Sequence, residues 1–228
     1  MQTLVADQLW TDAQPLRVLG LPLGRRLGVA RNAAGGLVVF SPLKGSAAAI
    51  RALSDLGEVQ AFVVPSRYHD LFFPDYFAAF PQAAFLAGEA TCRDHPAWPL
   101  TPLTAAHPAL AGFRVARIEG MPRVQEHVFL HEVTRTLIVA DLFFNLPIAA
   151  DPLTRFWMRL ADMGGRPRPS RLWRSCIGDP AAFTASLREV LTWPFDRILP
   201  GHGECVVAQG PHVLREAFAP WLESARRG

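Results

Sequence analysis

The chain has 228 residues, of which 50% are hydrophobic and 19% are charged, and its formal net charge is +3. This composition allows a sizeable apolar core and excludes an extended disordered chain. Arginine carries nearly all of the positive charge and is scattered, at Arg25–Arg26, Arg166–Arg174 and Arg226–Arg227, so no nucleic-acid partner is expected.

The first forty residues consist of short apolar segments separated by turns. Leu16–Leu19 is mostly apolar, Leu27–Arg31 alternates, and Leu37–Phe40 is apolar throughout. Alternation and short apolar runs bounded by glycine are typical of strands. This region therefore predicts an opening β-meander.

The next segment switches between two periodicities. Ser46–Leu56 has apolar residues at helical spacing behind a serine that can cap a helix. Val59–Val64 is a largely apolar strand, Pro74–Phe80 a short helix, and Ala83–Ala87 another strand. Strands that alternate with helices in this way predict parallel pairing, with helices packed on the sheet.

The middle of the chain is less regular. Thr91–Leu110 is rich in proline and histidine and is predicted to be irregular. Phe113–Ile118, Glu126–His131 and Leu137–Ala140 are predicted strands, the last two joined by a tight turn.

The last third is predicted to be mainly helical. The expected helices are Asp151–Asp162, Pro180–Leu191 and Val213–Ala225, the last interrupted at Pro220. A short strand, Arg197–Leu199, precedes a Pro-Gly-His-Gly sequence. No repeat or linker divides the chain, so we expect one domain spanning residues 1–228.

The cysteines, Cys92, Cys176 and Cys205, are odd in number and far apart. This spacing indicates neither a zinc finger nor a disulfide framework. The first residues lack the pattern of a signal peptide, and no apolar run reaches the roughly 20 residues of a membrane span. We therefore expect a cytoplasmic protein with no membrane partner.

Polar residues recur at one structural position, directly after a predicted buried strand. They are His69 and Asp70 after Val59–Val64, Asp141 after Leu137–Ala140, and His202 after Arg197–Leu199. Ligands collect beyond the carboxyl ends of strands in open α/β sheets, and imidazole and carboxylate suit zinc, manganese or iron. The sequence therefore predicts a metal site at this edge.

Each of these residues also has an ordinary structural interpretation. A lone His69 is typical of a surface loop, and Asp141 is compatible with a turn cap. His202 is harder to explain in this way, because Gly201 and Gly203 allow a tight turn that fixes its imidazole. The remaining histidines near proline or in helices, among them His95, are interpreted as surface residues.

Two of these segments resemble motifs of the metallo-β-lactamase superfamily. The sequence Ile-Leu-Pro-Gly-His-Gly at 198–203 is similar to its late histidine motif, and Leu-Ile-Val-Ala-Asp-Leu-Phe at 137–143 to its strand with a bridging aspartate. Order and spacing match over most of the chain. The resemblance implies an αββα sandwich in which two mixed sheets are flanked by helices.

The first metal motif departs from the family pattern. Its paired histidines would fall near Ser66 and Tyr68, and His69-Asp70 is offset by one residue. The stretch is similar to a divergent branch of unknown function with an altered HxHxDH motif, although Ser66 and Asp70 are variants there too. The resemblance therefore implies one divalent metal ion, zinc first and iron or manganese as alternatives, or none if the site has decayed.

The third motif leaves two candidates. Glu126 and His127 are neighbours on a predicted strand and point to opposite faces, so only one of them can enter the site. Spacing to Asp141 favours Glu126, whereas the preference of metals for nitrogen favours His127. The full set of candidate ligands is His69, Glu126, His127, Asp141 and His202.

Two functions from different classes remain open. The first is a mononuclear metal-dependent hydrolase of an ester, thioester or phosphoester, with Asp70 and Asp141 as catalytic candidates and Arg67, Tyr68 and Arg123 as substrate contacts. The second is an inactive ligand-binding or interaction protein on the same fold. An iron-bound redox protein of the flavodiiron type ranks last, because it needs a richer ligand set. Aromatic residues such as Phe72 and Phe143 are compatible with a homodimer.

Overall fold

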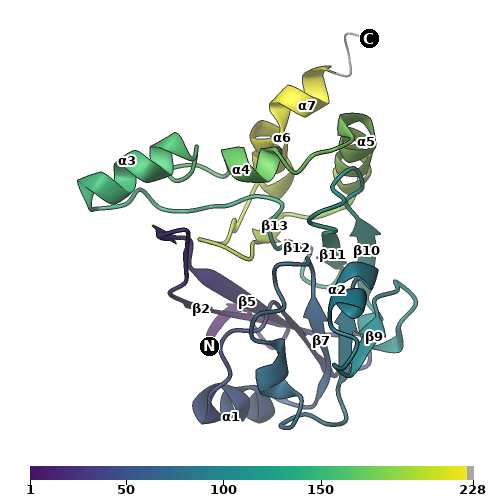
Figure 1. The fold of residues 1–228 in the computed structure, drawn as a ribbon. Helices are drawn as coiled ribbons and strands as arrows, with labels where there is room; N and C mark the ends of the chain where they lie inside the picture. The colour runs from purple at the N-terminus through teal and green to yellow at the C-terminus, as the bar shows by residue number, and fades with distance from the viewer. Residues whose placement is uncertain (225–228) are drawn as a thin grey trace.

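Two mixed β-sheets lie face to face in the computed structural model, which describes residues 1–224 (Figure 1). The first sheet has seven strands, which are in spatial order β1 (Gln2–Val5), β2 (Leu9–Gln14), β5 (Arg25–Arg31), β6 (Leu37–Phe40), β7 (Val59–Val64), β8 (Ala84–Ala87) and β9 (Leu100–Pro102). The second has four, β10 (Phe113–Arg117), β11 (His127–His131), β12 (Thr136–Ile138) and β13 (Arg197–Leu199). A small hairpin, β3 (Arg17–Val18) and β4 (Leu21–Pro22), precedes β5.

Helices cover the outer faces of both sheets (Figure 1). On the side of the first sheet are α1 (Ala47–Leu56), α2 (Glu89–Asp94) and the 3-10 turn η1 (Phe73–Tyr76), and a second 3-10 turn, η2 (Pro108–Leu110), precedes β10. The other helices are α3 (Pro152–Leu160), α4 (Arg171–Arg174), α5 (Pro180–Val190), α6 (Gly210–Ala217) and α7 (Ala219–Ser224). The architecture is the αββα sandwich that the sequence predicted.

Alternation along the strands assigns each apolar side chain to one of three layers. In β6, Val38 and Phe40 belong to the cluster between the sheets, and Leu37 and Val39 to the cluster shared with α1. In β11, Phe129 faces inward, whereas its neighbours pack in the outer cluster that contains α5. A period of two residues is what a strand buried on both faces requires.

A glycine allows a close approach between the two sheets. A Cβ atom on Gly28 in β5 would collide with the side chain of Leu199 in β13. These two strands belong to opposite sheets, so Gly28 lets the layer that carries the candidate site press against the first sheet.

Most predicted elements are confirmed, several at the predicted boundaries. Strands β6, β7 and β13 match their predicted ranges, and β6, β7 and β8 pair in parallel as expected. Ser46 caps α1 by accepting from the backbone N–H of Ala49 at 3.1 Å. The final helix is interrupted, but at Phe218 between α6 and α7 and not at the predicted Pro220, which lies in the first turn of α7. Ala225 lies outside the described residues.

The prediction that Thr91–Leu110 is irregular was wrong. This stretch contains the end of α2 and the edge strand β9, which pairs in parallel with β8. β9 has three residues and ends in a proline, which by itself disfavours a strand. Pairing with β8 at the edge of the sheet outweighs this local preference. Within residues 1–224, no helix is long and apolar enough to cross a lipid bilayer.

Candidate metal centre

Three loops that follow strands bring their polar residues together at one edge of the sandwich. His69 follows β7, Asp141 follows β12 and His202 follows β13. All three side chains are buried, and one ligand atom from each lies within 4.8 Å of the others. The parallel pairing of β12 with β13 places the last two loops side by side.

Asp141 lies at the centre of this group. Its Oδ1 atom is 3.3 Å from Nε2 of His69 and 3.4 Å from Nε2 of His202. Its Oδ2 atom accepts a short hydrogen bond from the hydroxyl of Ser66. One carboxylate oxygen is thus held by the protein, and the other faces both imidazoles.

Glu126 fixes the backbone that carries Asp141. Its two carboxylate oxygens accept from the N–H groups of Ala140 at 2.8 Å and of Asp141 at 3.0 Å. The side chain is fully buried, and burial together with the charge of Asp141 raises the pKa of Glu126 well above its ordinary value. Glu126 therefore supports the loop and is not a member of the group of three.

The hydrogen bonds of His202 fix its tautomer. Its Nδ1 atom is 2.6 Å from the carbonyl oxygen of Gly24, and a carbonyl only accepts, so Nδ1 carries the hydrogen. In the neutral imidazole, the lone pair on Nε2 then faces Oδ1 of Asp141. A cation between these two atoms turns this repulsive contact into an attractive one, which is the usual arrangement of a metal-binding histidine.

His69 is oriented by a serine hydroxyl, which can donate or accept, and not by a carbonyl. Its Nδ1 atom is 2.7 Å from the hydroxyl of Ser41, and its buried Nε2 atom has no hydrogen-bond partner. Buried polar atoms are normally satisfied. The unpaired nitrogen, aimed at Asp141, therefore shows that the residues fit a metal ion held by His69, Asp141 and His202.

Burial and local charge set the protonation states of the group. Burial lowers the pKa of His69 to about 4 against the opposing charge of Asp141, so this imidazole is neutral at pH 7. Burial would raise the pKa of Asp141, but the two histidines hold it well below its ordinary value. A neutral imidazole beside an ionised carboxylate is the state that binds metal.

A buried arginine supports the loop that contains His69. Arg25 donates to the carbonyl oxygen of His69, and more weakly to that of Tyr68 at 3.5 Å. Burial lowers its pKa to about 10 despite the charges of Asp141 and Asp70, so it remains a cation at pH 7. Its fixed charge lies close to the group of three.

The two glycines beside His202 are both required by their surroundings. Gly203 has a φ of +85°, which favours glycine. Gly201 has no such φ, but a Cβ there would lie 2.8 Å from the carbonyl oxygen of Ala140 and closer still to the ring of His69. A Cβ on Gly203 would also collide with the backbone of Asn145. Both glycines therefore allow a close approach of neighbouring loops, and Gly203 also allows the turn.

The structure places the other predicted residues outside the group of three. Asp70 pairs with Nε2 of His95 at 2.8 Å, and His95, partly exposed near the surface as predicted, stacks on Trp98. The ring of His127, on the face opposite Glu126, lies against Gly88.

The three predicted substrate contacts differ in whether their side chains are already paired. Arg67 forms a bidentate pair with Asp94 at 2.7 and 3.0 Å. Tyr68 and Arg123 are exposed. A hydrogen bond from the N–H of Arg67 to the carbonyl of Val124, at 3.0 Å, keeps the loops that carry these two residues together.

Sequence reasoning missed the residues that orient the group. Ser66, noted only as a substitution, holds Asp141, and Ser41, Gly24 and Arg25 were not assigned to the site. The sequence did contain signals for them: Pro22-Leu-Gly-Arg-Arg26 and Phe40-Ser-Pro42 also resemble the divergent branch, and the pair Arg25–Arg26 begins an otherwise apolar strand. Both side chains are buried.

Comparison with known proteins identifies the fold. No family model matches the sequence, and no curated protein matches it. Among solved structures, a fragment described as diflavin flavoprotein A 5 from Nostoc has a TM-score of 0.66 at 14% identity, covering 96% of this chain and 94% of that one. The metallo-β-lactamase FIM-1 from Pseudomonas aeruginosa in its mono-zinc form has a TM-score of 0.63 at 13% identity, with 97% and 93% covered.

A metallo-β-lactamase from Pontibacter korlensis gives a similar result, with a TM-score of 0.61 at 13% identity over 92% of this chain and 96% of that one. All three chains are covered almost completely at very low identity. The chain therefore has the metallo-β-lactamase fold, with a group of three candidate ligands at one edge.

Proposed function

We propose that the chain is a metal-dependent hydrolase in which His69, Asp141 and His202 hold one divalent ion, zinc first. The observation that carries this proposal is the convergence of two imidazole Nε2 atoms on Oδ1 of Asp141, at 3.3 and 3.4 Å. The carbonyl of Gly24 keeps the hydrogen of His202 on the far nitrogen, and Nε2 of His69 has no hydrogen-bond partner.

Two imidazoles and one carboxylate form a ligand set that leaves coordination positions open. Catalytic zinc sites typically have three protein ligands, whereas structural sites have four. The same set also accommodates iron(II), so the identity of the metal is decided by measurement. The mono-zinc form of the similar metallo-β-lactamase FIM-1 supports a single ion on this fold.

A single ion agrees with the surroundings of the site. Ser66 occupies the place of a predicted ligand and donates to Asp141, and Asp70 is engaged by His95. The buried cation Arg25 lies near Asp141 and Asp70, where it supplies positive charge that a second ion would otherwise provide. This arrangement lacks a second ligand set among the described residues.

Bound zinc would lower the pKa of water and polarise a carbonyl or phosphoryl oxygen. The protein residues orient the ligands: Ser66 and the loop held by Glu126 position Asp141, and Gly24 and Ser41 orient the two imidazoles. Tyr68 and Arg123, which are exposed, would contact an anionic part of an ester, thioester or phosphoester. Arg67 is paired with Asp94.

Metal content is the decisive measurement. We expect about one zinc per chain in protein purified without a histidine tag, or after zinc is added to chelator-treated protein. His202→Ala and Asp141→Ala should each lose the ion. His212→Ala is the matched control, because His212 is exposed on α6 and pairs with Glu216, away from the group of three.

Activity is tested separately on a panel of esters, thioesters and phosphodiesters, with Asp141→Ala as the blank. No bound metal in any condition would reject the proposal. One tightly bound zinc with no activity on the panel would instead favour the ligand-binding alternative. Loss of metal in His69→Ala alone would show that the ligand set is wrong.

A further inference from the structure

Helix α3 presents its apolar side to solvent. Leu153, Phe156, Trp157 and Leu160 are 66%, 58%, 50% and 50% exposed, and their spacing places them on one face of the helix. Its buried residue is Met158. Figure 1 shows α3 extending away from the other helices of its layer.

Two neighbouring segments also expose apolar side chains. Ile148 in the loop before α3 and Leu172 in α4 are each 65% exposed. We call these six residues, Ile148, Leu153, Phe156, Trp157, Leu160 and Leu172, the α3 patch. Burying a large apolar side chain contributes about 1.5–3 kcal/mol, so the exposure of four such residues on one face of a helix marks an interaction surface.

The segment that carries the α3 patch is strongly basic. Between Pro152 and Arg174 the sequence contains six arginines and one carboxylate, Asp162. Asp162 pairs with Arg168 and Arg174. Arg159, Arg166 and Arg171 are exposed, and the described structure gives their side chains no ion pair, so their charge is available to a partner.

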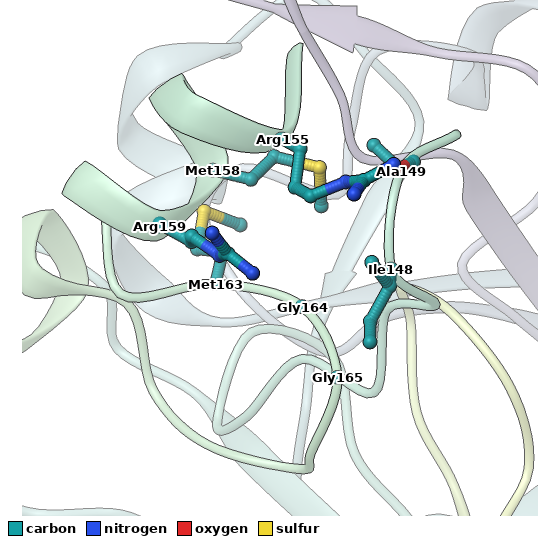
Figure 2. A pocket seen from close by; sticks show the side chains of 8 residues that line it. All are labelled: Ile148, Ala149, Arg155, Met158, Arg159, Met163, Gly164 and Gly165. Carbon is teal, nitrogen blue, oxygen red and sulfur yellow. The ribbon is translucent and has the colours of Figure 1, made fainter. Parts of the chain in front are cut away.

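A small cavity lies beside the helix. It measures about 90 Å³ and is lined by Arg155, Arg159, Met158, Met163 and the loop at Ile148. Figure 2 shows both arginines reaching from α3 along this cavity, with Ile148 across from them. Arg155 is anchored by donating to the carbonyls of Ala149 and Ala150 at 2.9 and 2.8 Å, whereas Arg159 is free to contact an anion.

We propose that the α3 patch and its arginines bind the surface of an anionic lipid bilayer. Leu153, Phe156, Trp157 and Leu160 would enter the boundary between headgroups and acyl chains, and Arg159 and its neighbours would contact lipid phosphates. Amphipathic helices with aromatic and leucine residues on one face and arginines beside them bind membranes in this way.

Charge complementarity distinguishes this partner from a second copy of the chain. A symmetric pairing of two α3 patches would bring two sets of unpaired arginines together, and like charges oppose such an interface. An anionic bilayer instead matches both the charge and the aliphatic residues. Residues 1–224 contain no helix that could span a bilayer, and a helix that lies in the interface needs none.

Vesicle sedimentation of the full chain tests the proposal. We expect binding to vesicles of phosphatidylcholine mixed with phosphatidylglycerol, weakened by salt, and little binding to phosphatidylcholine alone. Trp157→Ser/Leu160→Ser should weaken binding more than tenfold. Arg159→Gln and Arg166→Gln should each weaken it about fivefold.

A matched control removes apolar residues elsewhere. Val133→Ser/Val207→Ser changes two residues that are each 65% exposed and that lie at the ends of β12 and β13 away from the metal centre. This variant should bind vesicles like the wild type. Both double variants should keep the wild-type unfolding midpoint and zinc stoichiometry, because the changed residues are on the surface.

Several results would overturn the proposal. They are equal binding to neutral and anionic vesicles, no binding to either, or full binding by Trp157→Ser/Leu160→Ser. A dimer in sedimentation equilibrium that this variant converts to monomer would show that a second copy covers the α3 patch instead. Vesicle binding is expected with and without zinc, so its outcome is separate from that of the hydrolase proposal.

Discussion

Gly201→Ala tests whether close packing of two loops positions the metal ligands. The added Cβ would lie 2.8 Å from the carbonyl oxygen of Ala140, whereas ordinary contact begins at 3.4 Å. The loops must therefore separate by at least about 0.6 Å, the difference between these distances, and the ring of His69 is closer still. Neither neighbour yields easily, because one is backbone and the other is a buried ring held by Ser41.

The expected effects follow from this displacement. Overpacking of this kind costs roughly 1–3 kcal/mol of stability, and displaced ligands or their supports weaken metal binding by about 10–100-fold. Urea unfolding of the zinc-free protein measures the first effect, and competition for zinc with a chromophoric chelator measures the second.

Gly35→Ala separates the two effects. A side chain at Gly35 would strain the backbone, because its φ is +87°, but it would meet no neighbour, because nothing lies within 4 Å of its Cβ position. This variant should lose about 1 kcal/mol of stability and keep its zinc affinity. If Gly201→Ala binds zinc as tightly as Gly35→Ala does, the packing at Gly201 does not position His69.

Three further predictions concern the residues around the site. Ser41→Ala removes the partner of Nδ1 of His69 and should weaken zinc binding about 10–100-fold; unchanged affinity in the same chelator assay would contradict this role. Glu126→Ala leaves the buried N–H groups of Ala140 and Asp141 unpaired. The free energy of unfolding, measured in urea, should fall by at least about 2 kcal/mol, and wild-type stability would show that water replaces the carboxylate. Burial lowers the pKa of His127 from 6.5 to about 4, so between these pH values the unfolded chain binds a proton that the folded chain does not. The free energy of unfolding of the zinc-free protein should therefore fall by on the order of 2 kcal/mol as the pH is lowered through this range. His127→Asn should reduce this pH dependence, whereas His212→Asn should not.

The local elements follow directly from local patterns. Val59–Val64 is apolar at every position except Gln60, because both faces of β7 are buried, against α1 and η1 on one side and the second sheet on the other. Ser46 predicted the start of α1 because its hydroxyl satisfies a backbone donor that the helix leaves free. Both features depend on residues that are close together in the sequence, so they can be predicted without the tertiary structure.

The edge of the sheet was harder to predict. Leu100–Pro102 has no alternating pattern, and it becomes β9 only because β8 offers unpaired backbone groups beside it. The membrane-facing character we propose for α3 was also hidden, because apolar residues at helical spacing normally indicate a buried face. Only the position of α3 outside the helical layer shows that Phe156 and Trp157 are exposed.

The sequence by itself determined that His69, Asp141 and His202 follow buried strands, which places them at one edge of the sandwich. The tertiary structure decided which atoms meet there. Ser66 turns to Asp141 while Asp70, four residues later, turns to His95, and Gly24 reaches His202 from the opposite end of the chain. Such contacts depend on how two sheets and their loops pack at distances of a few ångströms, and no periodicity along the chain records that packing.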